Sequence, residues 1–176
     1  MKGCTAGMCS CAAVVLLPQE SNADQSGNPE LDRSAQRLSA ARVRFAKLIG
    51  ILNEDLDAGT RKKVLQKLGR DCARQYSGLL DKYKGDLAGF LAEGRKQWME
   101  TAEYDEKAGT IRIVDKLKTC SCPLVQVGST PAEFCECTLG WQKEAYSTIL
   151  GKPVEAEIEE SILRGGSRCV FRIRLV

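Results

Sequence analysis

The chain has 176 residues, of which 43% are hydrophobic and 28% charged, with a net charge of +3, nine cysteines and no histidine. The absence of histidine excludes Ser-His-Asp and Cys-His catalytic arrangements and every metal site that depends on imidazole. Because the charges are nearly balanced and interspersed, we expect one ordinary globular domain with no nucleic-acid partner.

Residues 1–23 are typical of an export signal. An uncharged, largely apolar run over residues 3–17 precedes small residues at Ser21 and Ala23, the two positions that a signal peptidase inspects. The run is too short to span a bilayer, so we expect no stable membrane span in the mature chain. It also resembles the middle of a twin-arginine signal whose arginine pair would lie upstream of Met1. We expect an exported, periplasmic protein on this interpretation, and a cytoplasmic one if the segment is an ordinary N-terminus.

Residues 24–32 are polar and are predicted to be a linker, followed by a single domain over residues 33–176. Apolar residues from about residue 31 to 98 recur at helical spacing, which predicts three or so helices. Two short alternating segments, 102–105 and 110–117, are then predicted to pair as a hairpin.

Thr130, Pro131 and Glu133 have the order of a capping box with proline at the first helical position. They predict a helix over residues 131–150 that ends at Gly151. The apolar residues cover a broad arc of this helix, so we expect it to be buried.

A β-hairpin is predicted at the C-terminus, because residues 154–163 and 169–175 both alternate between apolar and charged. A turn at residues 165–166 places Glu159 opposite Arg172 as a cross-strand ion pair. Helices followed by an antiparallel sheet, packed with one long buried helix, predict an α+β domain.

Six cysteines follow the predicted signal, and four of them form two Cys-x-Cys pairs. Zinc binds four such ligands in a tetrahedron. Two residues of one helix separated by a single residue lie about 200° apart, so one ion takes only one of Cys135 and Cys137 unless the first turn of the helix is unwound. We therefore predict a closed, structural zinc site, with Cys137 and Cys72 as substitute ligands. The predicted ligands are Cys120, Cys122, Cys135 and Cys169. Free buried thiols, disulfides and a reactive thiol pair are the alternatives.

The spacing of Cys135, Gly140, Gly151, Pro153 and Cys169 resembles the C-terminal half of the vinyl-reductase-type small-molecule-binding domain. That domain is also the sensor of aromatic-responsive transcription activators, and its fold is shared with nitric-oxide-sensing and Golgi-transport proteins. The wider pattern is similar to a bacterial family akin to proteins labelled aminothiazoline-carboxylate hydrolases, which transfers no catalytic residue.

The resemblance also implies a zinc site. In the sensor members three cysteines and a glutamate hold the metal, and residue-by-residue carry-over gives Cys135 and Cys169 as two ligands. The other two positions fall on Ile158 and Ser161, which cannot serve in the same way. Either the site is lost or Cys120-x-Cys122 completes it.

Two functions follow from these patterns. The first is a binding module for a small apolar or aromatic ligand, with a homodimer as one oligomeric state that it could adopt. Four aromatic residues are candidates for the walls of its pocket, and the alternative is that they are ordinary residues of the hydrophobic core. The candidate walls are Trp98, Trp141, Tyr146 and Phe171. The second is a hydrolase of a small C–N or C–S heterocycle with Glu160 as acid or base, since strand alternation places Glu160 on an apolar face where burial raises a carboxyl pKa. A strand-edge residue that reaches solvent is the alternative for Glu160. All-thiolate coordination is typically structural, so we favour the binding module.

Overall fold

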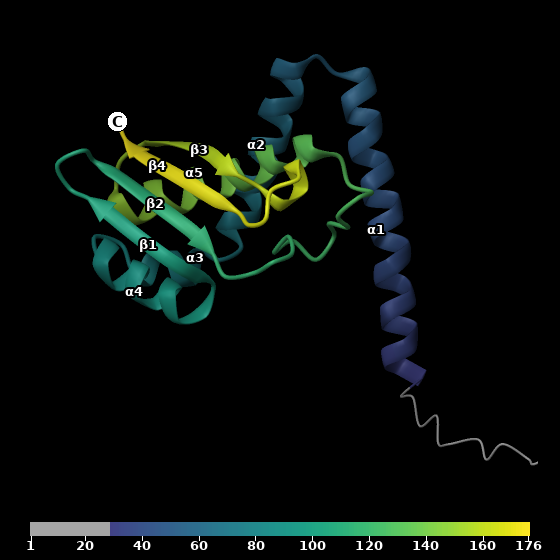
Figure 1. Ribbon diagram of the computed structural model, residues 1–176, viewed down its shortest axis with the longest axis horizontal. Helices are drawn as coiled ribbons and strands as arrows, with labels where there is room; N and C mark the ends of the chain where they lie inside the picture. The colour runs from purple at the N-terminus through teal and green to yellow at the C-terminus, as the bar shows by residue number, and fades with distance from the viewer. Residues whose placement is uncertain (1–28) are drawn as a thin grey trace, which may run out of the picture.

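The computed structural model describes residues 29–176 (Figure 1). The predicted export signal lies outside the described residues, as does most of the predicted linker. Helix α1 (Pro29–Asp55) includes the last four residues of that predicted linker, with proline at its first position and Asp32 in its first turn. Among residues 29–176, no helix is both long and apolar enough to cross a membrane.

Four helices precede the sheet, where the spacing predicted three or so: α1, α2 (Ala58–Arg74), α3 (Ser77–Lys82) and α4 (Leu87–Gln97). Asp57 starts α2 by accepting hydrogen bonds from the backbone NH groups of Gly59 and Thr60, and Asp86 starts α4 in the same way. Short turns with capping residues therefore divide the stretch of helical spacing over residues 31–98 into separate helices.

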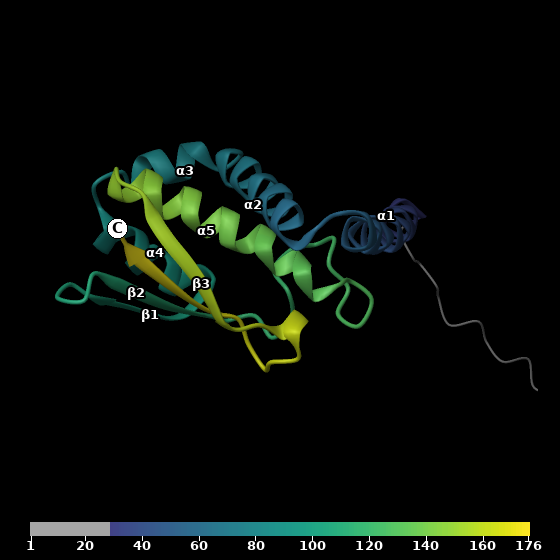
Figure 2. The ribbon, with the colours of Figure 1, turned by 90° about the horizontal axis from the view of Figure 1, so that it is seen from above.

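The sheet has four antiparallel strands in the order β1-β2-β4-β3. Their bounds are β1 Met99–Asp105, β2 Thr110–Asp115, β3 Val154–Glu160 and β4 Val170–Leu175. Helix α5 (Cys135–Leu150) lies across one face of this sheet and α2 packs on the outer side of α5 (Figure 2). The architecture is the predicted α+β class, with a C-terminal pair of strands.

The predicted helix over 131–150 begins differently from the expectation. A 3-10 turn, Ala132–Phe134, precedes α5, and the Thr130 hydroxyl accepts a hydrogen bond from the Gln126 backbone NH instead of capping the helix. The predicted capping box is therefore wrong, because the loop before the helix takes its hydroxyl. The predicted end is confirmed: Gly151 terminates α5 with φ of +66°, a left-handed conformation that glycine adopts without steric cost.

The strands β3 and β4 pair as predicted, but in a register shifted by two residues. A 3-10 turn over Ile162–Arg164 takes up residues that were expected to extend the strand, so Arg172 lies opposite Glu157. Because the shift is even up to Ile158, the side chains from Val154 to Ile158 keep their predicted faces, and the register then changes between Ile158 and Glu160. Glu159 consequently still reaches Arg172, now as a diagonal neighbour.

The main core fills the space between α4, α5 and the inner face of the sheet. Phe90 is its centre: its ring packs edge-to-face on Tyr146 at 5.6 Å and lies 5.8 Å from Trp98. A smaller core joins the C-terminal half of α1 to the loop before α5, where Phe45 packs edge-to-face on Phe134 at 4.8 Å.

Helices α2 and α5 cross in backbone contact. A Cβ atom built on Gly140 would overlap the Gln66 carbonyl, and one built on Gly69 would overlap the Cys137 carbonyl. Two glycines therefore set the separation of these helices, which in turn positions the N-terminal end of α5 and its two cysteines.

Candidate functional site

A small cavity of about 20 Å³ lies where the end of β2, the start of α5 and the start of β4 meet. Three of the four predicted metal ligands, Cys120, Cys135 and Cys169, line it together with Asp115 and Ser161. The Cys135 sulfur lies 3.1 Å from the Ser161 hydroxyl. The backbone NH of Asp115 donates to the Cys169 carbonyl at 3.0 Å, which fixes the end of β2 beside β4.

Cys122 does not line this cavity. It packs instead against the smaller core, together with Cys120 and with Cys137, one of the two predicted substitutes. Burial, with the neighbouring thiols, raises the pKa of Cys137 to about 12, and burial raises that of Cys120 to about 11. A reactive cysteine needs a lowered pKa, so these two values do not favour the reactive-thiol alternative.

All six cysteines in residues 29–176 are free thiols. Three thiols and a carboxylate are a donor set that zinc accepts. In the described part of the chain, however, no three cysteine, aspartate or glutamate side chains converge closely enough to hold a metal ion. The donors around the cavity thus have suitable chemistry and stand too far apart for coordination as they lie.

Burial raises the pKa of Asp115 to about 6. Burial raises the pKa of the Tyr146 hydroxyl, and the negative charge of Asp115 raises this pKa further. Asp115 therefore links the cysteine-lined cavity to the main core.

The four predicted pocket walls lie in or against the main core. Tyr146 and Phe171 are buried in it, and Trp98 and Trp141 pack against it half-buried. The Tyr146 hydroxyl and the Gln142 side-chain carbonyl are buried with no hydrogen-bond partner. Each unsatisfied buried group of this kind costs about 1–3 kcal/mol.

Glu160 does not have the environment that alternation predicted. Its carboxylate accepts hydrogen bonds from the Ser167 backbone NH, the Ser167 hydroxyl and the Arg168 backbone NH. These bonds, led by the Ser167 backbone, lower the pKa of Glu160. The expected raised pKa is therefore wrong, because the loop before β4 folds back over the carboxylate and stabilises its charge.

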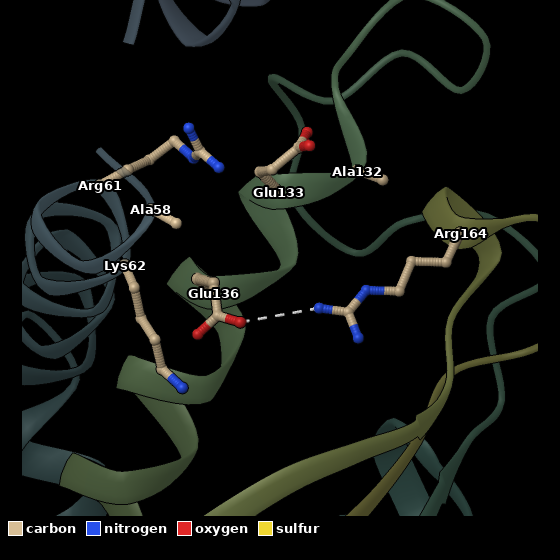
Figure 3. A pocket seen from close by; sticks show the side chains of 7 residues that line it. All are labelled: Ala58, Arg61, Lys62, Ala132, Glu133, Glu136 and Arg164. Carbon is tan, nitrogen blue, oxygen red and sulfur yellow. Dashed lines mark ion pairs between the residues drawn. The ribbon is translucent and has the colours of Figure 1, made fainter. Parts of the chain in front are cut away.

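A larger cavity, of about 420 Å³, was not foreseen from the sequence. It lies between the start of α2, the start of α5 and the 3-10 turn after β3 (Figure 3). Its lining residues are Ala58, Arg61, Lys62, Ala132, Glu133, Glu136 and Arg164. These residues come from separate segments and form no local pattern, so no signal in the sequence groups them.

No protein-family model matches this chain, and neither does any curated protein sequence. Solved structures do match. A trafficking protein particle complex subunit 3 from Naegleria fowleri, covalently bound to palmitic acid, has a TM-score of 0.52 at 16% identity, over 81% of this chain and 96% of that one. The phenol-responsive sensory domain of the transcription activator PoxR, with phenol, has a TM-score of 0.52 at 13% identity, over 76% of this chain and 74% of that one.

A vinyl-4-reductase family protein from Methanocaldococcus jannaschii also matches, with a TM-score of 0.36 at 10% identity, over 87% of this chain and 85% of that one. At these identities the matches concern the fold alone. The fold expected from the resemblance is thereby confirmed, since a sensory domain and a trafficking subunit share it.

Proposed function

We propose that this chain is a small-molecule-binding domain for a small apolar or aromatic ligand. Two solved structures of the same fold were obtained with such molecules, one with phenol and one with palmitic acid. Those ligands belong to those proteins, and they support a binding role for this chain without identifying its ligand.

The unpartnered Tyr146 hydroxyl is the observation on which the proposal rests. Tyr146 is 0% exposed, and its ring packs on Phe90 in the main core. Buried hydroxyl groups almost always have a partner. A ligand with an aromatic body and one polar group would supply that partner, while its body would take the place of apolar contacts between α5 and the sheet.

Calorimetric titration with phenol tests this proposal. Tyr146→Phe keeps the ring and removes the hydroxyl, so phenol should bind the variant roughly fivefold to tenfold more weakly. The variant should not unfold more easily, because it loses no internal hydrogen bond. Tyr76→Phe is the matched control, since Tyr76 is 53% exposed. Absence of phenol binding, or equal binding to wild type and Tyr146→Phe, would overturn the proposal.

We also propose one structural zinc ion held by Cys120, Cys135 and Cys169, with Asp115 or Cys122 as the fourth ligand. The support is that the three cysteines and Asp115 line one cavity. Coordination requires these donors to lie closer together than they do in the structure. Purified protein should then contain one zinc per chain, and Cys135→Ser should lose it while Cys72→Ser, at an exposed position, keeps it. Metal-free wild-type protein, or a disulfide among these cysteines, would contradict this assignment.

We also propose that the chain is exported and that it forms a homodimer. Export rests on residues 1–23 and is tested by finding the chain in the periplasm with a new N-terminus after residue 23. A homodimer is supported by the exposed apolar residues Leu31 and Leu38 of α1. The hydrolase alternative has no observation in its favour, because the Glu160 carboxylate is fixed by the loop before β4.

A further inference from the structure

The 420 Å³ cavity has the size of a small-molecule site, and three cationic side chains from two elements border it. Arg61 and Lys62 extend from the first turns of α2, and Arg164 extends from the 3-10 turn before β4 (Figure 3). Two carboxylates, Glu133 and Glu136, stand between them on the segment that opens α5. The occupant is decided by which of these five charges already have partners.

Both carboxylates are satisfied from within the protein. Glu133 accepts a hydrogen bond from the Asn53 side-chain amide at 2.9 Å, and Glu136 accepts one from the Gln66 side-chain amide at 2.8 Å. The backbone NH of Glu133 and the Asn53 amide hold the pKa of Glu133 below its usual range. Neutral amides thus hold both carboxylates in place, and they use up none of the surrounding positive charge.

The cations have donors to spare. Lys62 makes no hydrogen bond or ion pair with any residue in the range 29–176. Among residues 29–176, the Arg164 side chain has one ion pair, with Glu136 at 3.7 Å, which is too long for a hydrogen bond. Arg61 uses one terminal nitrogen to bind the backbone carbonyls of Asn53 and Leu56, at 3.2 Å each, and keeps its other donors.

The charge balance of the cavity sets the charge of its occupant. Three cations and two carboxylates leave one net positive charge among the lining residues. A group with a single negative charge neutralises it, whereas a dianionic phosphate would leave a surplus beside Glu133 and Glu136. Arginine binds a carboxylate through paired NH groups, and the methyl groups of Ala58 and Ala132 offer apolar contact to the rest of a small molecule.

We propose that this cavity binds a small organic molecule through a single carboxylate, held by Lys62 and Arg164 with Arg61 beside them. This site is separate from the aromatic core around Tyr146 and takes a ligand of different chemistry. It is therefore independent of the proposed phenol-type site.

The test is a titration of the full chain with para-fluorobenzoate, in which fluorine NMR measures binding. Para-fluorobenzamide, of nearly the same shape but neutral, and inorganic phosphate serve as comparison probes. Lys62→Gln and Arg164→Gln should each weaken fluorobenzoate binding about tenfold or more, because each removes a charge-assisted hydrogen bond. Lys67→Gln, an exposed lysine of the same helix that does not line the cavity, should leave binding unchanged.

The outcomes separate this proposal from the first one. Loss of binding in Lys62→Gln and Arg164→Gln but not in Tyr146→Phe would support the cavity as the carboxylate site. Equal binding of the amide, tighter binding of phosphate, or no effect of either cavity variant would overturn it. Both substituted side chains are exposed, so thermal unfolding should match wild type and the affinities remain comparable.

Discussion

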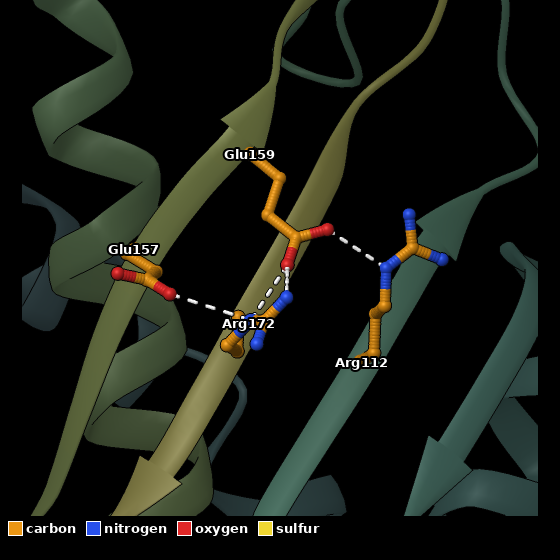
Figure 4. Close-up of polar contacts among 4 residues, drawn as sticks. All are labelled: Arg112, Glu157, Glu159 and Arg172. Atoms are coloured by element: carbon orange, nitrogen blue, oxygen red, sulfur yellow. Dashed lines mark hydrogen bonds and ion pairs between the residues drawn. The ribbon is translucent and has the colours of Figure 1, made fainter.

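Glu159 joins three strands of the sheet through one carboxylate. From β3 it accepts hydrogen bonds from Arg172 on β4 at 2.6 Å and from Arg112 on β2 at 2.7 Å (Figure 4). Arg172 also forms an ion pair with Glu157 at 3.3 Å. A carboxylate with two guanidinium partners is better ordered than an isolated surface pair, because several contacts share the entropy cost of fixing its side chain.

The pKa of Glu159 is lowered, first by its hydrogen bond to Arg112 and also by Arg172. A pKa that is lower in the folded state stabilises the fold above the pKa of the unfolded chain, and this contribution disappears as the pH falls through the folded-state value. Glu159→Gln should therefore lower the free energy of unfolding by about 0.5–1 kcal/mol at pH 7 and by much less below about pH 4.

Chemical denaturation at both pH values measures this difference. Glu157→Gln is the control, because its single contact is longer and its side chain is more exposed, so its loss should be smaller. Equal losses at neutral and acidic pH would mean that the charge of Glu159 does not contribute to stability.

At the scale of single residues, the sequence indicated several side chains correctly and could not place others. Strand alternation correctly predicted that Phe171 is buried, and Gly151 correctly predicted the end of α5. The partners of Glu160 were not predictable, because they depend on a loop that folds back from beyond the turn. The same holds for Cys122, since a Cys-x-Cys pair in a loop does not reveal which way each thiol faces.

Among the helices, the contact between α2 and α5 depends on glycine at position 140. Gly140→Ala would place a methyl group on the Gln66 carbonyl, so the helices must separate and the variant should lose about 1–3 kcal/mol of stability. The same substitution at Gly50 in α1 meets no atom within 4 Å and should instead stabilise the protein by up to about 1 kcal/mol. Thermal and urea unfolding of both variants compares the two effects, and a neutral Gly140→Ala would show that the helices tolerate a wider separation.

Hydrophobic periodicity predicted the helices and strands well, but it did not predict the 3-10 turns at their ends. The 3-10 turns before α5 and after β3 depend on contacts with Gln126 and on the Ser161 hydroxyl, which accepts from the Arg164 backbone NH. The large cavity follows from the meeting of these two turns with α2. A site assembled from irregular ends of elements far apart in the sequence leaves no spacing to detect.

On the scale of the whole molecule, α1 extends beyond the rest of the fold (Figure 1). Every residue from Pro29 to Ala40 is exposed. Leu31, Leu38, Phe45 and Leu52 recur at seven-residue intervals on one face of this helix. Phe45 and Leu52 pack against the smaller core, whereas Leu31 is 67% and Leu38 37% exposed. A second copy of the chain would continue the same stripe of apolar contacts.

Sedimentation at micromolar to millimolar concentrations should therefore detect a dimer that Leu31→Glu with Leu38→Glu abolishes. Because both side chains are exposed, the variant should stay folded. Gln36→Glu with Ser39→Glu adds two carboxylates on another face of α1 and should remain dimeric. A monomeric wild-type chain over this range would contradict the expected self-association.

The strand order has a consequence for synthesis. β4 is the last strand in the sequence, yet it lies between β2 and β3 inside the sheet. Until residues 170–175 leave the ribosome, the β1–β2 hairpin and the α5–β3 unit each present an unpaired edge, and unpaired edges invite association with other chains. Premature termination or proteolysis before residue 170 would thus leave two incomplete halves with no strand to join them, which makes loss of this short C-terminal segment more damaging than its length suggests.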